Sequence, residues 1–198
     1  MNLPTITKNI LLINIAVFLL TQLFGLRLSV EHFALFPISN PNFQIWQFIS
    51  HMFLHANILH ILMNMLMFIS FAPFCERVFG EKRFTIFYLA SGVFASIFYL
   101  MFAGPSIPII GASGAMFSIF IFFALCNPEE KIYLFFIPIG IRIKIVAIGL
   151  LIFEIWSALF GANDGVGHTA HIGGAIFGTL IFLSLNKWEQ LRNLSTGR

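Results

Sequence analysis

Long apolar stretches with few charges constrain this chain more than any other feature. Of its 198 residues, 59% are hydrophobic and 10% are charged, whereas soluble proteins carry about 25% charged residues. An apolar helix of roughly 17–25 residues can cross a bilayer because it pairs its backbone polar groups internally. We therefore expect an all-α integral membrane protein with one domain over residues 1–198.

The apolar stretches divide the chain into six candidate membrane spans. They lie near residues 9–25, 52–74, 84–103, 113–126, 143–160 and 170–186. The first is interpreted as a retained helix rather than a secretory signal, since no clear cleavage site follows it. The fourth and sixth are short for membrane spans.

Basic residues predict the orientation of these spans. If six helices alternate, Arg27 is the one Lys or Arg on its side of the membrane. Because Lys and Arg collect in cytoplasmic loops, both termini are expected in the cytoplasm. With no organellar targeting signal apparent, the bacterial inner membrane is the expected location, and no basic groove suggests nucleic-acid binding. Cys75 and Cys126 then face the cytoplasm, where disulfides are rare, and are interpreted as packing residues.

Polar residues from three spans converge at one depth in the outer half of the membrane. At about 1.5 Å per residue, a short fourth span leaves Ser113 about 9 Å below the outer edge of a ~30 Å hydrocarbon core. The same reasoning places His60 about 12 Å down, with Asn64 one turn deeper, and His171 about 6 Å down. Polar groups are costly at such depths, so their convergence indicates a functional site in a lipid bilayer.

Ser113 and His171 are the residue types that nucleophilic catalysis needs. A serine hydroxyl is a weak nucleophile until a base such as a neutral imidazole takes its proton. The Ser113 amide at a helix start could stabilise an oxyanion, together with His60 and Asn64 on one helix face. Asp164, in a predicted loop, is not assigned as a third member of this pair.

Glycines favour a close approach around both residues. Gly111 and Gly114 bracket the serine and would let a substrate backbone come near. Gly174 and Gly178 are four residues apart, a spacing that lets one helix pack tightly on another. Since His171 shares their face, such packing would bring its imidazole toward the serine. Taken alone, each pair indicates no more than ordinary helix packing.

Three motifs occur in order along the chain: HANILHILMN at 55–64, GASG at 111–114, and AHIGG at 170–174 followed by Gly178. Together they resemble the rhomboid intramembrane serine proteases over essentially the whole chain. The resemblance implies the minimal six-helix rhomboid fold, without a cofactor, and cleavage of single-pass membrane proteins. It also implies Ser113 as nucleophile, His171 as general base, and His60 and Asn64 as oxyanion donors.

A few positions depart from the family pattern or lie beside it. Trp46-Gln47 stands where rhomboids often carry Trp-Arg, so anchoring of the external loop by an arginine is absent. Phe117 stands one turn after the serine, where Tyr is frequent, and can stack beneath His171 without a hydroxyl. His55 resembles a family position beside the site, with a role either in tuning it or in orienting the external loop.

Other polar residues allow a functional and a structural interpretation. His51 and His55 have the spacing of a metal pair that His168 and His171 could complete, but the glutamate of the HExxH pattern is missing, so no metal is expected. Glu154 lies inside the fifth span, where an ionisable group suggests function. Because the sequence names no partner for it, it is interpreted as a protonated or hydrogen-bonded packing residue, and its role stays open.

Two other functions stay open at this level. A catalytically silent rhomboid-like protein would bind membrane clients without cutting them, although the complete set of four site residues counts against it. A small transporter would need polar residues across the whole membrane thickness, and here they cluster in the outer half. Glu76 and Arg77 resemble a structural pair of the family and are interpreted as cytoplasmic interface charges. No feature indicates an oligomeric state.

Overall fold

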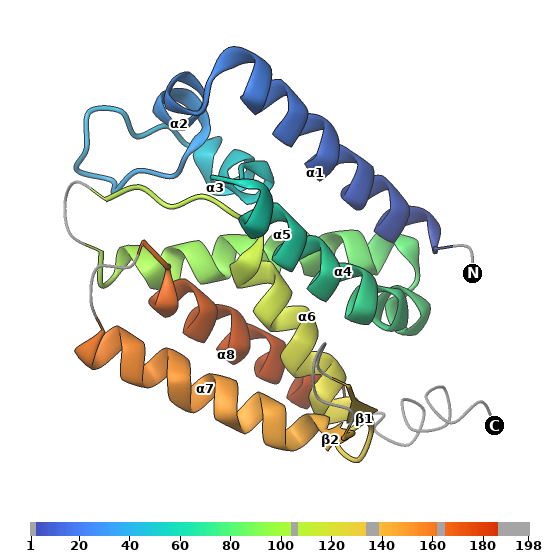
Figure 1. The fold of residues 1–198 in the computed structure, drawn as a ribbon. Helices are drawn as coiled ribbons and strands as arrows, with labels where there is room; N and C mark the ends of the chain where they lie inside the picture. The colour runs from blue at the N-terminus through green and yellow to red at the C-terminus, as the bar shows by residue number, and fades with distance from the viewer. Residues whose placement is uncertain (1–2, 104–106, 134–138, 162–164, 186–198) are drawn as a thin grey trace.

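The computed structural model describes residues 3–103, 107–133, 139–161 and 165–185. Asp164 and the last residue of the predicted span 170–186 therefore lie outside the described residues. The helices form a bundle with α1 and α7 on opposite outer sides (Figure 1). In chain order the elements are α1 (Thr5–Phe24), α2 (Leu26–Phe33), α3 (Gln47–Ser50), the 3-10 turn η1 (His51–Phe53), α4 (Ile58–Phe79), α5 (Glu81–Leu100), α6 (Ser113–Cys126), β1 (Lys131–Ile132), β2 (Ile141–Arg142), α7 (Ile143–Phe160) and α8 (His168–Ser184).

Apolar helices make this a multi-pass membrane protein, as the sequence predicts. Within the described ranges, α1, α4, α5 and α7 are long and apolar enough to cross a membrane. The apolar helices α6 and α8 are shorter, with 14 and 17 residues. α4 begins at Ile58 rather than near residue 52, because Asn57 Oδ1 accepts the His60 N–H at 2.9 Å and caps the helix there.

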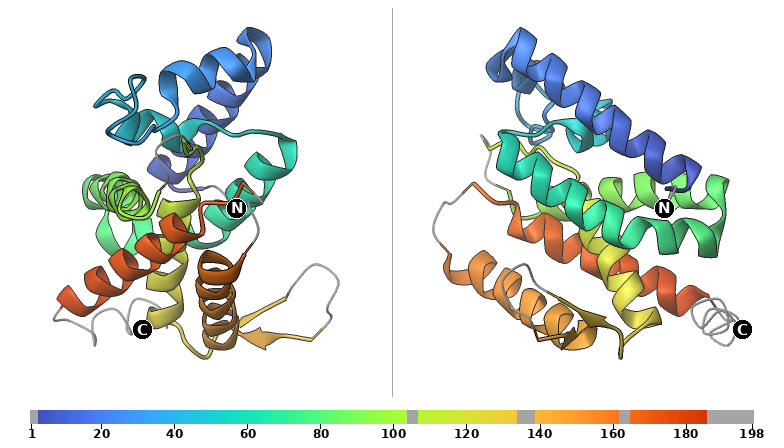
Figure 2. Two further views of the ribbon diagram at one scale, coloured as in Figure 1. Left: turned by 90° about the vertical axis from the view of Figure 1, so that its left-hand side faces the viewer. Right: turned by 45° about the vertical axis from the view of Figure 1, so that its right-hand side comes forward.

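α6 runs through the middle of the bundle (Figure 2), in contact with α4, α5, α7 and α8. It is apolar on all faces, and 11 of its 14 residues are buried. A helix that is apolar all round is stable when other elements cover every side. Its Met116 and Phe122 share one core cluster with Phe68 of α4, Tyr88 of α5 and the buried free thiol Cys75. Ser113, the first residue of α6, thus begins a firmly packed helix.

α8 packs on α6 more extensively than any other described pair of helices does. A Cβ built at Gly174 would overlap the carbonyl oxygen of Gly114, and one at Gly178 would overlap that of Ser118. Only glycine therefore permits the observed approach of the two backbones. This contact holds the first turns of α8, which carry His171, beside the start of α6.

α1 and α7 are the peripheral helices. Over an apolar stretch of 18 residues, 22% of α1 and of α7 is buried, against 44% of α4 and of α5. Large apolar side chains such as Leu23 on α1 and Phe160 on α7 are exposed. A membrane protein can present such side chains to lipid, where they carry no hydration cost.

Glu76 fastens α1 to α4. Its carboxylate accepts the N–H groups of Ile6 at 2.9 Å and Thr7 at 2.7 Å, and the Thr7 hydroxyl at 2.7 Å. The interpretation of Glu76 as an interface charge is wrong, since the residue is buried. The contact spans about 70 positions in sequence, so no local pattern could reveal it. A carboxylate at a helix N-terminus satisfies amides that have no partner within the helix.

Candidate active site

Gln47 anchors the connection between α2 and α4. Its side chain is fully buried, and Oε1 accepts the N–H groups of Phe36 at 3.3 Å and Gln44 at 3.1 Å. Its Nε2 donates to the Asn42 carbonyl at 2.9 Å, and Trp46 Nε1 donates to the His32 carbonyl at 3.2 Å. A neutral amide therefore orders this loop at the position where an arginine is frequent in rhomboids.

The same connection holds the segment that leads into α6. Leu35 and Ile109 exchange backbone hydrogen bonds of 3.0 and 2.9 Å, and the Gly111 N–H donates to the His51 carbonyl at 2.8 Å. His51 is buried, with Nδ1 2.7 Å from the Gln47 carbonyl oxygen. Burial lowers the pKa of His51 to about 4, so this ring is neutral near pH 7. Backbone hydrogen bonds from the α2–α4 connection therefore fix the start of α6, in addition to its packing in the core.

Gly111 makes the turn from this segment into α6. Its φ of +114° lies in a region that L side chains rarely adopt. A Cβ there would also lie 2.7 Å from His60 Nε2, inside van der Waals contact. Glycine is therefore required twice, by the backbone conformation and by the approach of the imidazole.

The structure brings Ser113 of α6 and His171 of α8 together. Ser113 Oγ lies 2.7 Å from His171 Nε2, within hydrogen-bond distance. The Phe117 ring, one turn along α6, stacks on the His171 ring with centroids 4.4 Å apart and planes 9° apart. This stacking fixes the plane of the imidazole while its edge faces the serine.

Glu154 of α7 faces the other edge of His171. Its Oε2 lies 3.0 Å from His171 Nδ1 and 2.6 Å from His168 Nδ1. The sequence named no partner for Glu154, and the structure supplies two histidines on α8, one of which is hydrogen-bonded to it. They follow it by 14 and 17 positions across a loop, a separation that no helix periodicity links.

Glu154, His168 and His171 are also the one group in the described part of the chain whose atoms could share a metal ion. His51 and His55 are not part of that group. The histidine set suggested by sequence spacing is therefore divided between two places.

A cavity of about 400 Å³ adjoins the serine. His60, Gly111, Ser113, Gly114 and His168 are among its lining residues. Its walls come from α4, α5, α6, α7 and α8, so five helices enclose one space. Such a concave site with convergent polar groups is typical of a binding or catalytic pocket.

The predicted oxyanion donors differ in their placement. His60 lines the cavity, and its Nδ1 accepts the Ala56 N–H at 3.4 Å, which assigns the ring proton to Nε2. Asn64 is buried and absent from the described lining, because its Nδ2 donates to the His60 carbonyl at 2.9 Å. His55 is fully buried and contacts the His60 ring edge to face at 4.9 Å. It supports His60 from behind.

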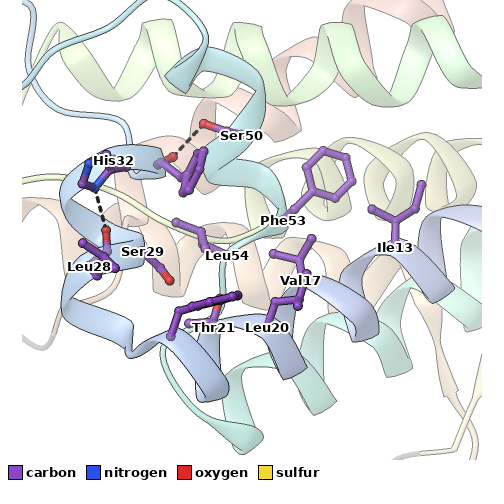
Figure 3. Close-up of a pocket in the computed structure, with 12 residues that line it drawn as sticks. Ile13, Val17, Leu20, Thr21, Leu28, Ser29, His32, Ser50, Phe53 and Leu54 are labelled. Atoms are coloured by element: carbon purple, nitrogen blue, oxygen red, sulfur yellow. Dashed lines mark hydrogen bonds between the residues drawn. The ribbon is translucent and has the colours of Figure 1, made fainter.

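A second hollow, of about 530 Å³, lies between α1, α2 and residues 50–54 (Figure 3). Its lining is mostly apolar, with Val17, Leu20 and Leu54 among the residues drawn. The hydroxyls of Ser29 and Ser50 donate to backbone carbonyls at 3.1 and 2.8 Å. Neither serine therefore has the imidazole partner that Ser113 has, and the larger hollow is not the candidate active site.

Comparisons with known proteins show the family of this chain. The Rhomboid domain model matches residues 42–187. YdcA of Bacillus subtilis, a candidate rhomboid protease, is 30% identical over 155 residues, which cover 75% of this chain and 72% of YdcA. The rhomboid protease GlpG of Haemophilus influenzae is 28% identical over 140 residues, covering 69% and 68% of the two chains. RHOMBOID-like protein 6, mitochondrial, of Arabidopsis thaliana is 34% identical over 157 residues, 76% of this chain and 48% of that protein. This chain belongs to the rhomboid family.

Proposed function

We propose that the protein is an intramembrane serine endopeptidase in which Ser113 is the nucleophile and His171 the general base. The observation that carries the proposal is the 2.7 Å separation of Ser113 Oγ and His171 Nε2 beside a cavity inside an apolar bundle. Relatives that bear the name rhomboid protease support the same reaction class. No cofactor enters this scheme.

The reaction follows from the two contacting atoms. His171 Nε2 takes the hydroxyl proton as Ser113 Oγ attacks the substrate carbonyl carbon. The imidazolium then protonates the leaving amine, and the peptide C–N bond breaks to leave an acyl-enzyme. Water enters, loses a proton to His171 Nε2 and attacks the ester carbon. The imidazolium then returns the proton to Ser113 Oγ as the ester C–O bond breaks, which releases the carboxylic acid.

Donors for the oxyanion lie at the start of α6 and on α4. The first amides of a helix have no partner within it, so the Ser113 N–H is available at the positive end of the helix dipole. His60 Nε2–H, which faces Gly111, is the second donor. Asn64 serves as a third if its amide turns from the His60 carbonyl toward the cavity.

The membrane arrangement follows from helix length and charge. We propose that all six apolar helices cross the bilayer, with both termini in the cytoplasm of a bacterium and the cavity toward the outside. The start of α1 and the end of α8 lie at the same end of the bundle (Figure 1), which supports this orientation. With 14 residues, α6 extends about 21 Å, so Ser113 lies below the surface of a ~30 Å core.

The proposed substrates are single-pass membrane proteins. An intact helix keeps its carbonyls in hydrogen bonds and covers them with side chains. The substrate must therefore unwind locally before Ser113 can reach a carbonyl carbon. Helix-destabilising residues near the scissile bond, with a small residue at the cut, should favour turnover.

A fluorophosphonate probe and a single-pass model substrate test the proposal on the detergent-purified chain. Wild type should be labelled and should cut the substrate, whereas Ser113→Ala should do neither. Ser118→Ala is the matched control, because Ser118 lies on the same helix with a buried hydroxyl that has no hydrogen-bond partner in the described residues. A folded wild type that is neither labelled nor active would favour the alternative, a catalytically silent client-binding protein.

A further inference from the structure

Glu154 completes a line of contacts that begins at the serine. Ser113 of α6, His171 of α8 and Glu154 of α7 follow one another at 2.7 Å and 3.0 Å, through opposite ring nitrogens of the histidine. All three helices must be in place for the line to exist. Two residues would suffice for proton transfer, so the position of the third calls for an explanation.

Burial makes Glu154 costly unless something compensates its charge. Its side chain is 6% exposed, and the side chains of His168 and His171 are 8% and 10% exposed. An ionised carboxylate away from water needs partners that can donate hydrogen bonds or carry positive charge. Imidazole Nδ1–H groups meet this need, and an imidazolium meets it better than a neutral ring does.

We infer that Glu154 is a positioning residue that acts on Ser113 through His171, an inference that rests on the proposed function. By accepting Nδ1–H it keeps the ring proton on that nitrogen, so Nε2 is left with the lone pair that faces Ser113. When Nε2 takes the serine proton, the carboxylate stabilises the imidazolium that forms. Glu154 itself stays ionised and transfers no proton.

The contact between His171 Nδ1 and Glu154 Oε2 is close in distance, at 3.0 Å, but is not aligned as a hydrogen bond in this structure. Catalytic hydrogen bonds often align only when substrate is bound.

His168 holds the carboxylate from a second direction. Its Nδ1 lies 2.6 Å from the same Oε2, and the Phe153 ring packs edge to face on it at 6.0 Å. Each of the other helices that bound the cavity supplies a titratable or polar group: His60 from α4, Tyr99 from α5 and Ser113 from α6. The pH dependence of the site therefore belongs to His171 with His60, His168 and Glu154 around it.

The spacing of the three ligand-type atoms favours hydrogen bonding over a shared metal. Two ligands bound to one tetrahedral zinc at ~2.1 Å are about 3.4 Å apart. Glu154 Oε2 is 2.6 Å from one imidazole nitrogen and 3.0 Å from the other. Both separations are shorter than the distance between two ligands of one zinc ion, and the contact with His168 is a hydrogen bond.

The test compares Glu154→Gln with Glu76→Gln in the full detergent-purified chain. As whole residues, both glutamates are 4% exposed, but Glu76 accepts hydrogen bonds from the start of α1. We expect Glu154→Gln to lower kcat and the rate of fluorophosphonate labelling by roughly 10²- to 10⁴-fold with little change in KM. The acidic limb of kcat/KM should move to lower pH, because the imidazolium loses its stabilising charge. Glu154→Asp should recover part of the rate.

A purely structural role would lower the melting temperature and leave that limb in place, as expected for Glu76→Gln. The inference is overturned if folded Glu154→Gln keeps a rate within threefold of wild type. It is also overturned if EDTA abolishes wild-type activity and Zn²⁺ restores it. Failure of the proposed function would look different, since wild type itself would then not be labelled.

Discussion

The two buried glutamates of this chain lie in comparable surroundings and have different partners. Glu76 and Glu154 are each 4% exposed inside an apolar bundle. Glu76 accepts two backbone amides and a hydroxyl, none of which changes its protonation near neutral pH. Glu154 faces two imidazoles, which do. The partners of a buried carboxylate therefore indicate whether it stabilises the fold or acts on the site. Burial alone does not distinguish these two roles.

Backbone packing between α8 and α6 holds His171 in place, and Gly174→Ala should disrupt this packing. The added methyl would overlap the Gly114 carbonyl and lie 3.3 Å from Phe117 Cβ, which pushes α8 from α6. Overpacking of this kind costs about 1–3 kcal/mol, and a displacement of about 1 Å at the reacting atoms can lower the rate by roughly 10²-fold. Labelling rates and thermal unfolding measure the two effects.

Gly149→Ala supplies the control for this substitution. Gly149 lies on α7 with nothing within 4 Å of an added Cβ. Alanine there should keep the labelling rate and raise helix stability slightly. Equal behaviour of the two variants would mean that the α6–α8 contact does not set the distance between Ser113 and His171.

Glu76→Gln should lower the stability of the fold and leave the reaction at Ser113 unchanged. Gln retains an acceptor but loses the charge that strengthens the hydrogen bonds from Ile6 and Thr7. Hydrogen bonds to charged groups contribute about 1.5–3 kcal/mol, so a loss of that order in the free energy of unfolding is expected. The labelling rate per folded molecule should stay within twofold of wild type. A rate that fell with Glu76→Gln as far as with Glu154→Gln would remove the distinction between the two carboxylates.

His51 is a buried histidine outside the proposed Ser113–His171 pair, and its effect on stability should depend on pH. Burial lowers its pKa from 6.5 to about 4, so the folded chain holds it neutral while the unfolded chain protonates it. The contribution of His51 to the free energy of unfolding is therefore complete above pH 6.5. It decreases as pH falls from there toward 4, by up to about 3 kcal/mol. Thermal unfolding between pH 8 and pH 4 should show this decrease in wild type and less of it in His51→Gln. Identical pH dependence in both proteins would contradict the assignment to His51.

The site was predictable from sequence where the motif was local and unpredictable where the partner was distant. GASG at 111–114 and the small-residue spacing around His171 predict a close meeting of two helices, and the structure brings their side chains to 2.7 Å. The partners of Glu76 and Glu154 depend on packing between helices far apart in sequence. Apolar periodicity says which face is buried but not which polar groups meet there. Gln47 shows the same limit, because its four-way anchoring depends on a folded loop.

Phe117→Tyr should have the smallest effect of these substitutions. It tests which contacts orient the His171 ring. The Phe117 ring stacks on the imidazole at 4.4 Å, and tyrosine preserves that face while adding a hydroxyl at the far end. Because Ser113 Oγ lies 2.7 Å from His171 Nε2 and Glu154 Oε2 lies 3.0 Å from Nδ1, we expect the new hydroxyl to bond neither ring nitrogen. We expect kcat/KM within threefold of wild type, with an unmoved acidic limb, whereas Phe117→Ala should lower it about tenfold by freeing the ring plane. A large gain from tyrosine would show that His171 needs orientation beyond what stacking and Glu154 supply.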